Sequence, residues 1–305
     1  MRVSVAVLGE CMLELSHAQI NDEDTAMPMR MKYGGDTINT SIYLSRGGVA
    51  VSYVTALGDD LMSDWLIAEW EKEGIDCALV TRMPNSVPGM YMINVSEEGE
   101  RSFLYWRKNS PASRLFDNQG LAEVIFQSLS SYPYLYLSGI SLAILKPAPR
   151  ERLMNLLNEY HLQGGKIIFD GNYRRQLWLD PDLARQAYKQ LYRITSIALP
   201  TYEDEAELFG HDSVEVVLNS IRDLGVNEVV VKMGSEGCLV SQNGEMRYVQ
   251  ANLVDPVDTT AAGDSFNAGY LAARFKGVTG PEACFAGHAL ASKVIQCQGA
   301  IMPRD

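Results

Sequence analysis

The residues best suited to chemistry lie near the end of the chain, in a run of small residues that contains one acid. Residues 258–269 have the sequence DTTAAGDSFNAG, and their second half begins a helical pattern. The first turn of a helix offers unpaired backbone N–H groups and the positive end of the helix dipole. Ala261, Ala262 and Gly263 are small enough to leave those amides open to an anion such as phosphate. Asp264 follows in the first turn, where its carboxylate could take a proton from a substrate hydroxyl.

An anion-binding helix start beside a base predicts phosphoryl transfer to an alcohol. The alternative is an ordinary loop of small residues that Asp264 caps. The sequence contains no Gly-Lys-Ser/Thr and no GxGxxG motif, so phosphate binding would depend on the amides of residues 261–263.

The elements that position these residues follow a regular alternation in the second half of the chain. Short apolar or β-branched runs predict strands at residues 3–8, 51–57, 134–137, 166–170, 194–199 and 228–232. Helical patterns occur at residues 36–46, 61–73, 150–161, 182–192 and 214–224. This alternation predicts an α/β fold with a doubly wound, mostly parallel sheet flanked by helices. Ligands of such sheets bind at the carboxyl ends of the strands.

Two further segments do not fit that sheet. Residues 12–33 and 88–108 contain alternating polar and apolar runs, and the second segment has a polar turn at residues 97–100. We expect these segments to form a small β lid over the mouth of the main sheet. Because no linker or repeat interrupts the sequence, residues 1–305 are expected to form a single domain. Unpaired lid edges favour a homodimer or a higher assembly.

The composition limits the classes of function. The chain has 305 residues, of which 47% are hydrophobic and 21% charged, as is typical of a globular protein with a sizeable core. A formal charge of −12 argues against nucleic acid or an anionic membrane as a partner. Five scattered cysteines without a CxxC motif indicate reduced thiols and a cytoplasmic location. No apolar run approaches membrane-spanning length.

Local arginines could still attract an anionic substrate. Tyr105 and Arg107 share one face of a predicted lid strand, and Tyr91 lies on the strand before it. Arg174 follows the strand at residues 166–170, at the edge of the sheet where ligands bind. Two arginines that converge on one pocket favour a substrate carboxylate. The alternative for the lid residues is a solvated strand face.

Glycines mark two other candidate sites. Gly34 and Gly35 precede a predicted helix that carries Asn39, whose amide can both donate to and accept from sugar hydroxyls. A simple turn before a helix is the alternative. Gly234 and Gly237 form a Gly-x-x-Gly turn at the end of another strand, which alone is weak evidence for a nucleotide loop.

These motifs resemble those of the ribokinase-like (PfkB) carbohydrate kinases. Residues 258–269 are similar to the C-terminal signature of that family, which usually has Gly where this chain has Ala261. Gly34, Gly35 and Asn39 match the N-terminal signature. The resemblance extends over essentially the whole chain, and it implies a ribokinase-like fold, a sugar substrate, ATP and Mg²⁺.

The resemblance also implies roles for individual residues. Asp264 would be the base, and the amides of residues 261–263 would stabilise the transferred charge. The residues expected to contact the sugar are Gly34, Gly35, Asn39, Tyr91, Tyr105, Arg107, Arg174 and Asp264. Those expected to contact the nucleotide are Asn172, Lys232, Gly234, Ser235, Gly237, Ala262 and Gly263.

The metal site departs from the family pattern. Members usually carry Asn-x-x-Glu after a strand, which organises Mg²⁺ through water. Alignment on Pro200 places Thr201 and Asp204 at these positions, whereas alignment on Ala206 selects Glu205. Asp204 and Glu205 therefore both remain candidates, and an acidic first helical turn is the alternative.

Within the family, the chain is most similar to the 2-keto-3-deoxygluconate kinases. The shared patterns are GER at residues 99–101, YWR at 105–107, YLSGIS at 136–141 and NYR at 172–174. The resemblance implies ATP-dependent phosphorylation of 2-keto-3-deoxy-D-gluconate at O-6, giving 2-keto-3-deoxy-6-phosphogluconate and ADP. The alternatives are a fructokinase or ribokinase that acts on a neutral sugar and a sensor of sugar acids or nucleotides without catalytic activity.

Overall fold

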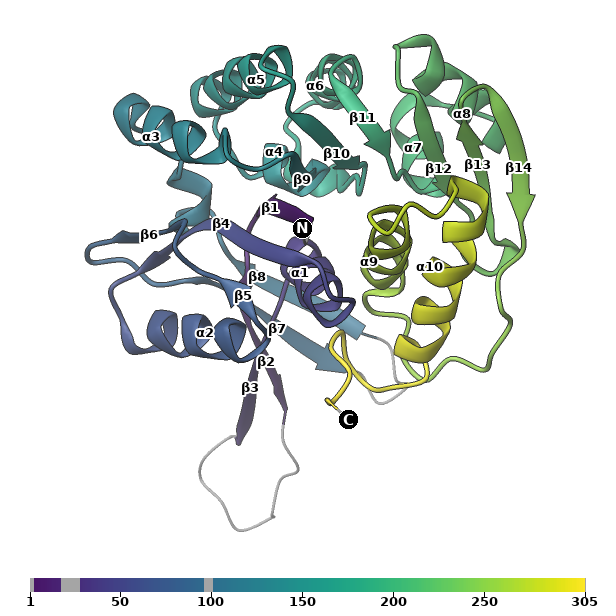
Figure 1. Ribbon diagram of the computed structural model, residues 1–305. Helices are drawn as coiled ribbons and strands as arrows, with labels where there is room; N and C mark the ends of the chain where they lie inside the picture. The colour runs from purple at the N-terminus through teal and green to yellow at the C-terminus, as the bar shows by residue number, and fades with distance from the viewer. Residues whose placement is uncertain (1–2, 18–27, 96–100, 305) are drawn as a thin grey trace.

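A computed structural model describes residues 3–17, 28–95 and 101–304, and two sheets organise them (Figure 1). Within these residues the larger sheet has ten strands in the order β14-β13-β12-β11-β10-β9-β1-β4-β5, with β6 also paired to β4. The smaller sheet has four described strands in the order β3-β2-β7-β8. The predicted fold class, a doubly wound and mostly parallel sheet with a small separate sheet, is confirmed.

The centre of the large sheet is parallel. It consists of β1 (Ser4–Leu8), β4 (Ala50–Gly58), β9 (Tyr134–Ser138), β10 (Lys166–Asp170), β11 (Thr195–Ala198) and β12 (Glu228–Lys232). The sequence patterns predicted these strands to within one residue at each end. The patterns missed β5 (Ile75–Asp76), β6 (Val80–Met83), β13 (Cys238–Gln242) and β14 (Glu245–Val249). The last two add to β12 as an antiparallel hairpin.

Helices cover both faces of this sheet. One face carries α1 (Asp36–Arg46), α2 (Leu61–Lys72), α9 (Ala262–Arg274) and α10 (Gly280–Val294). The other carries α3 (Gln119–Leu129), α4 (Gly139–Ala143), α5 (Pro147–Leu162), α6 (Pro181–Tyr192), α7 (Tyr202–Phe209) and α8 (Val214–Asp223). Three short 3₁₀ turns are described, at Ala112–Arg114, Arg175–Leu177 and Gly234–Glu236. None of the described helices is long and apolar enough to span a bilayer.

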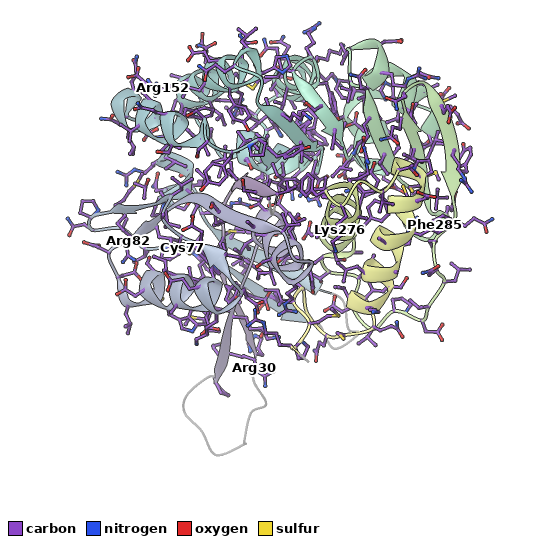
Figure 2. All side chains as sticks on the ribbon, viewed as in Figure 1. Arg30, Cys77, Arg82, Arg152, Lys276 and Phe285 are labelled. Atoms are coloured by element: carbon purple, nitrogen blue, oxygen red, sulfur yellow. The ribbon has the colours of Figure 1, made fainter. Side chains whose placement is uncertain are left out.

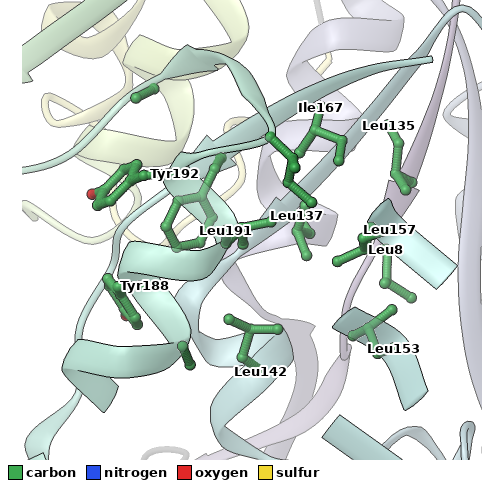
Figure 3. Packing of buried hydrophobic residues seen from close by; sticks show 14 of the residues in the cluster. Leu8, Leu135, Leu137, Leu142, Leu153, Leu157, Ile167, Tyr188, Leu191 and Tyr192 are labelled. Atoms are coloured by element: carbon green, nitrogen blue, oxygen red, sulfur yellow. The ribbon is translucent and has the colours of Figure 1, made fainter. Parts of the chain in front are cut away.

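Successive side chains of the parallel strands enter two different core layers. Leu135 and Leu137 of β9 pack under α5 and α6, whereas Tyr136 between them faces α1 and α9. Figure 3 shows part of the first layer, to which both leucines and Tyr188 and Tyr192 of α6 belong. Burial on both faces explains why the strands are continuous apolar runs.

The small sheet consists of β2 (Met12–His17), β3 (Met29–Gly34), β7 (Gly89–Val95) and β8 (Arg101–Trp106). β2 pairs with β3 antiparallel and with β7 parallel, and β8 completes a hairpin with β7. These strands fall in the two segments that the sequence placed outside the main sheet, although residues 97–100 of the expected turn lie outside the described residues. The function of this sheet as a lid stays a prediction, as does the assignment of residues 1–305 to a single domain.

Candidate active site

A cavity of about 650 Å³ opens at the carboxyl edge of the large sheet. Its walls come from the segments after β10 and β11, from the first turns of α1 and α9, and from the small sheet. A second cavity of about 490 Å³ lies on the other side of the start of α9. Both cavities are lined by Thr201, Lys232, Thr259, Ala262 and Gly263. They therefore meet where the sequence predicted an anion site.

The start of α9 is a sharp turn. Ala261, the N-cap, has φ 62° and ψ 19°, a left-handed conformation that favours glycine over residues with a side chain. Its carbonyl oxygen accepts a hydrogen bond from the amide of Ser265 at 2.9 Å. The amide of Ala262 donates to the carbonyl of Thr259 at 3.2 Å, so this one of the three predicted anion-binding amides already has a partner.

Asp264 lies in the first turn of α9 and lines the larger cavity. Its Oδ2 accepts a hydrogen bond from Nδ2 of Asn39 at 2.9 Å, which fixes the carboxylate against α1. Burial, and next the negative charge of Asp36, raises the pKa of Asp264 to about 7. A carboxylate with a pKa near neutrality is suited to general-base chemistry at physiological pH.

Asn39 and Gly35, at the start of α1, line the same cavity as Asp264. Asn39 was predicted to contact the sugar, and the structure shows that its nitrogen is used to orient Asp264. Its Oδ1 is buried and has no hydrogen-bond partner among the described residues, so it is left for a hydroxyl donor. Gly35 lines the cavity, and a Cβ there would lie 2.4 Å from the carbonyl oxygen of Glu10. Gly34 lies behind it, where a Cβ would lie 2.9 Å from the hydroxyl of Tyr91.

The small sheet supplies the aromatic and basic residues that the sequence predicted. Tyr91, Tyr105 and Arg107 all line the larger cavity, with the two tyrosine rings 5.9 Å apart. Arg107 forms an ion pair with Glu10, two residues after the end of β1, and the hydroxyl of Tyr91 donates to Glu14. The sequence analysis did not identify either glutamate as a site residue.

Arg174 and Asp204, predicted for different ligands, lie together. Nη1 of Arg174 is 3.3 Å from Oδ1 and 3.4 Å from Oδ2 of Asp204, and both residues line the larger cavity. Glu205, the other metal candidate, does not line it. Its side chain is buried and accepts a hydrogen bond from the hydroxyl of Tyr192 at 2.5 Å. Of the two predicted acids, Asp204 is the one that faces the cavity.

The nucleotide candidates divide between the two cavities. Gly234, Ser235 and Gly237 line the smaller cavity. Asn172 lines the larger one instead, and its Nδ2 donates to Oδ2 of Asp36 at 2.7 Å. The sequence analysis did not identify Asp36 as a site residue. Its position at the start of a helix, directly after two glycines, could have indicated that it lies at the ligand edge of the sheet.

Lys232 stands at the junction of the two cavities. Its Nζ is 3.2 Å from Oδ1 of Asp170 and 3.0 Å from Oδ1 of Asn267. Nδ2 of Asn267 in turn donates to Oδ2 of Asp170 at 2.9 Å. This buried network fixes a positive charge beside Gly263, whose Cβ would lie 3.6 Å from Nζ.

The fold and the site together define a class of protein. The chain matches the model of the pfkB family of carbohydrate kinases over residues 2–305, and it belongs to that family. It is 44% identical to the 2-dehydro-3-deoxygluconokinase of Escherichia coli K12, over 100% of this chain and 99% of the relative.

Solved structures agree on the fold. A PfkB protein from Polaromonas sp. JS666 superposes with a TM-score of 0.83 at 29% identity, covering 96% of each chain. A putative ribokinase II from Escherichia coli, in complex with ATP and Mg²⁺, gives a TM-score of 0.84 at 23% identity and covers 98% of this chain and 94% of its own.

Proposed function

We propose that the chain is an ATP-dependent 2-keto-3-deoxygluconate kinase that phosphorylates O-6 of its substrate. The observation that carries the proposal is that one cavity contains both Asp264, at the start of α9, and the two arginines Arg107 and Arg174. A base beside an anion site suits transfer to a hydroxyl, and two guanidinium groups suit a carboxylate elsewhere on the same small molecule. The full-length relative from Escherichia coli is named for this activity.

In the proposed reaction, Asp264 accepts the proton of the O-6 hydroxyl while that oxygen attacks the γ-phosphorus of ATP. The new O–P bond forms as the bond from the γ-phosphorus to the β–γ bridging oxygen breaks, and ADP leaves with that oxygen. The amides of Ala261 and Gly263, together with Nζ of Lys232, stabilise the phosphoryl charge at the junction of the cavities. Because the transition state is loose, the alignment of the reactants matters more than the strength of the base.

The acidic residues fit a magnesium ion that is bound mainly by ATP. Among the described residues no three His, Cys, Asp or Glu side chains are grouped as a metal cage. Mg²⁺ in kinases needs only one or two carboxylates, and Asp204 is suitably placed in the cavity wall to hold it through water. When bound, the ion neutralises phosphate charge. In the alignment on Pro200, Thr201 stands where the family usually has Asn, which gives Asp204 more of this role.

The smaller cavity is the proposed nucleotide site. Its wall combines the turn at residues 234–237 with the apolar side chains of Leu253, Val254 and Ile295. An apolar slot beside open glycine backbone suits the base and ribose of ATP.

Two further proposals concern the cellular setting. The five cysteines are unpaired, which supports a cytoplasmic location. The edge strand β8 exposes Phe103, Leu104, Tyr105 and Trp106 by 45%, 46%, 49% and 54%. An exposed apolar edge strand supports assembly with a second copy of the chain.

The test is coupled ATP turnover with 2-keto-3-deoxygluconate, fructose and ribose, each offered at saturating Mg²⁺. We expect turnover with the sugar acid and little with the neutral sugars. Preference for a neutral sugar would reject the proposed substrate, and no turnover with any of the three would reject the kinase activity.

A further inference from the structure

The two arginines of the cavity are held in different ways. The ion pair between Arg107 and Glu10 is buried, with the two side chains 11% and 1% exposed, and Glu10 also accepts a hydrogen bond from Ser110. The ion pair between Arg174 and Asp204 is longer, 3.3 Å, and its side chains are 42% and 19% exposed. Exposed ion pairs contribute little to stability and break easily, whereas breaking a buried ion pair leaves a buried charge without a partner. Arg107 is therefore fixed. Arg174 also donates to the carbonyl of Tyr173 at 2.6 Å, and its longer contact with Asp204 is the one that can be exchanged.

Asp204 lies close to the place where the two cavities meet, so its release from Arg174 would affect both of them. It belongs to the first turn of α7, three residues after Thr201, which lines both cavities. While Asp204 faces Arg174, its charge is neutralised by that guanidinium. A second carboxylate at Arg174 would place two negative charges side by side, which is unfavourable unless one of them gains another cation.

We propose that Asp204 is a specificity-determining residue, because the carboxylate of the substrate displaces it from Arg174 and thereby frees it for the magnesium nucleotide. This inference rests on the proposed function. A neutral sugar has no carboxylate and leaves the Arg174–Asp204 pair intact. The enzyme would then discriminate sugar acids from neutral sugars through the affinity for the nucleotide as well as through the affinity for the sugar. By linkage, nucleotide and sugar acid must strengthen each other's binding by the same factor.

The experiment is calorimetric titration of the full chain with MgADP, which cannot donate a phosphoryl group. We expect saturating 2-keto-3-deoxygluconate to tighten MgADP binding at least about fivefold, the lower end of common coupling factors. Fructose at the same concentration should leave the dissociation constant of MgADP unchanged. An equal effect of both sugars would overturn the inference, because it would show that the carboxylate is not what is sensed.

Two variants test the residues directly. In Arg174→Ala, Asp204 has no competing partner, so MgADP should bind tightly without the sugar acid, and adding the sugar acid should change nothing. In Asp204→Asn, the sugar acid should bind more tightly than in the wild type when nucleotide and Mg²⁺ are absent. Arg175→Ala is the matched control, since Arg175 neighbours Arg174 but donates to the carbonyl of Trp178 and does not line the cavity.

Persistence of the coupling in Arg174→Ala would overturn the inference, as would loss of coupling in Arg175→Ala. Failure here is distinguishable from failure of the proposed function. If the wild type turns over 2-keto-3-deoxygluconate but shows no coupling, only the exchange of partners is rejected. If it neither binds nor phosphorylates the sugar acid, the proposed function is rejected and this inference with it.

Discussion

Asp264 combines the position and the proton affinity that a base needs, and two neighbours, Asn39 and Asp36, help to set these properties. Asn39 fixes the carboxylate by a 2.9 Å hydrogen bond from the adjacent helix. Asp36 adds a negative charge that, after burial, is the largest cause of the raised pKa. The same hydrogen bond from Asn39 stabilises the ionised form and lowers the pKa, so orientation and basicity are balanced against each other.

Replacing Asp264 by Asn should remove the base with little change in shape. We expect kcat to fall about 10²–10⁴-fold, the usual contribution of a general base. The thermal unfolding midpoint should not fall, because Asn removes a buried carboxyl without changing side-chain volume. Coupled turnover and thermal unfolding of the same preparation check both statements. Turnover like that of the wild type would contradict the assignment of the base.

The pH dependence of activity should report this carboxyl. Since the pKa of Asp264 is about 7, the base is protonated below that pH, and kcat/KM should rise with pH up to about 7 and then level off. Asp36→Asn removes a charge that raises this pKa, so the rising limb should move to lower pH. Asp170 also raises the pKa and Lys232 lowers it, and both remain in the variant. A limb that stays in place would show that Asp36 does not act on the base.

At the scale of elements, the first turn of α9 separates the two cavities. Gly263 in this turn lines both cavities, so a side chain at this position would reduce the space in them. Its Cβ would lie 3.6 Å from Nζ of Lys232, an ordinary contact, so Gly263→Ala should fold. The unfolding free energy should stay level or rise by up to about 1 kcal/mol, because alanine favours helix. The added methyl group should nevertheless exclude phosphate. We expect kcat/KM for ATP to fall by at least about tenfold. Gly120→Ala, at the start of α3 and outside both cavities, is the control and should leave kinetics unchanged.

The other end of α9 is tied to the sheet by a buried acid. Nε and Nη2 of Arg274 donate to Glu228 of β12 at 2.8 and 2.6 Å, and the hydroxyl of Tyr270 donates to the same carboxylate at 2.6 Å. Arg274→Met leaves Glu228 buried without its cation and should cost about 3–5 kcal/mol of unfolding free energy, measured with urea.

An exposed ion pair provides the comparison for Arg274. Arg82 pairs with Asp64 at 2.6 Å, and their side chains are 35% and 62% exposed. Arg82 lies at the outer edge of the molecule in Figure 2. Arg82→Met should therefore cost no more than about 1 kcal/mol. Equal costs for the two variants would contradict the anchoring function of Arg274.

Local patterns predicted the elements far better than they predicted the pairs that build the site. The buried parallel strands were visible because both faces of the sheet are covered. β13 is also buried but ends in Ser241 and Gln242, which shortens its apolar run, and β14 is largely exposed, so neither carries a continuous apolar run. The hydrogen bond between Asn39 and Asp264 joins residues 225 positions apart, so no spacing within either motif indicates it.

The same limit applies to Asn172, whose hydrogen bond to Asp36 joins residues 136 positions apart, while its expected contact with the nucleotide stays a prediction. Residues at strand ends can be predicted to reach the ligand edge of the sheet, but their partners depend on how the elements pack. The family resemblance, which carries long-range information implicitly, supplied the sugar and phosphate motifs that composition and periodicity alone left open.

At the scale of the whole molecule, the buried acids of this acidic chain differ in how they are compensated. Asp170 and Glu228 each face a cation, Lys232 and Arg274. Glu205 is 1% exposed and has only the hydroxyl of Tyr192, and its Oε2 has no partner among the described residues. Burial raises the pKa of Glu205 to about 8, so near neutral pH this side chain is largely protonated in the folded protein.

Protonation of Glu205 makes the stability of the fold depend on pH in a definite direction. The pKa of Glu205 in the folded protein, about 8, lies above the ordinary value of 4.5, so the unfolded chain ionises first as the pH rises. The contribution of Glu205 to stability is complete below about pH 4.5 and is lost as the pH rises through 8, by at most about 1.4 kcal/mol per unit. Glu205→Gln should remove this pH dependence. In urea unfolding, the free energy of unfolding of the variant should therefore rise relative to that of the wild type between pH 5 and 8. Glu203→Gln, an exposed change in the same helical turn, should follow the wild-type curve, and parallel curves for all three proteins would show that Glu205 is ionised in the fold.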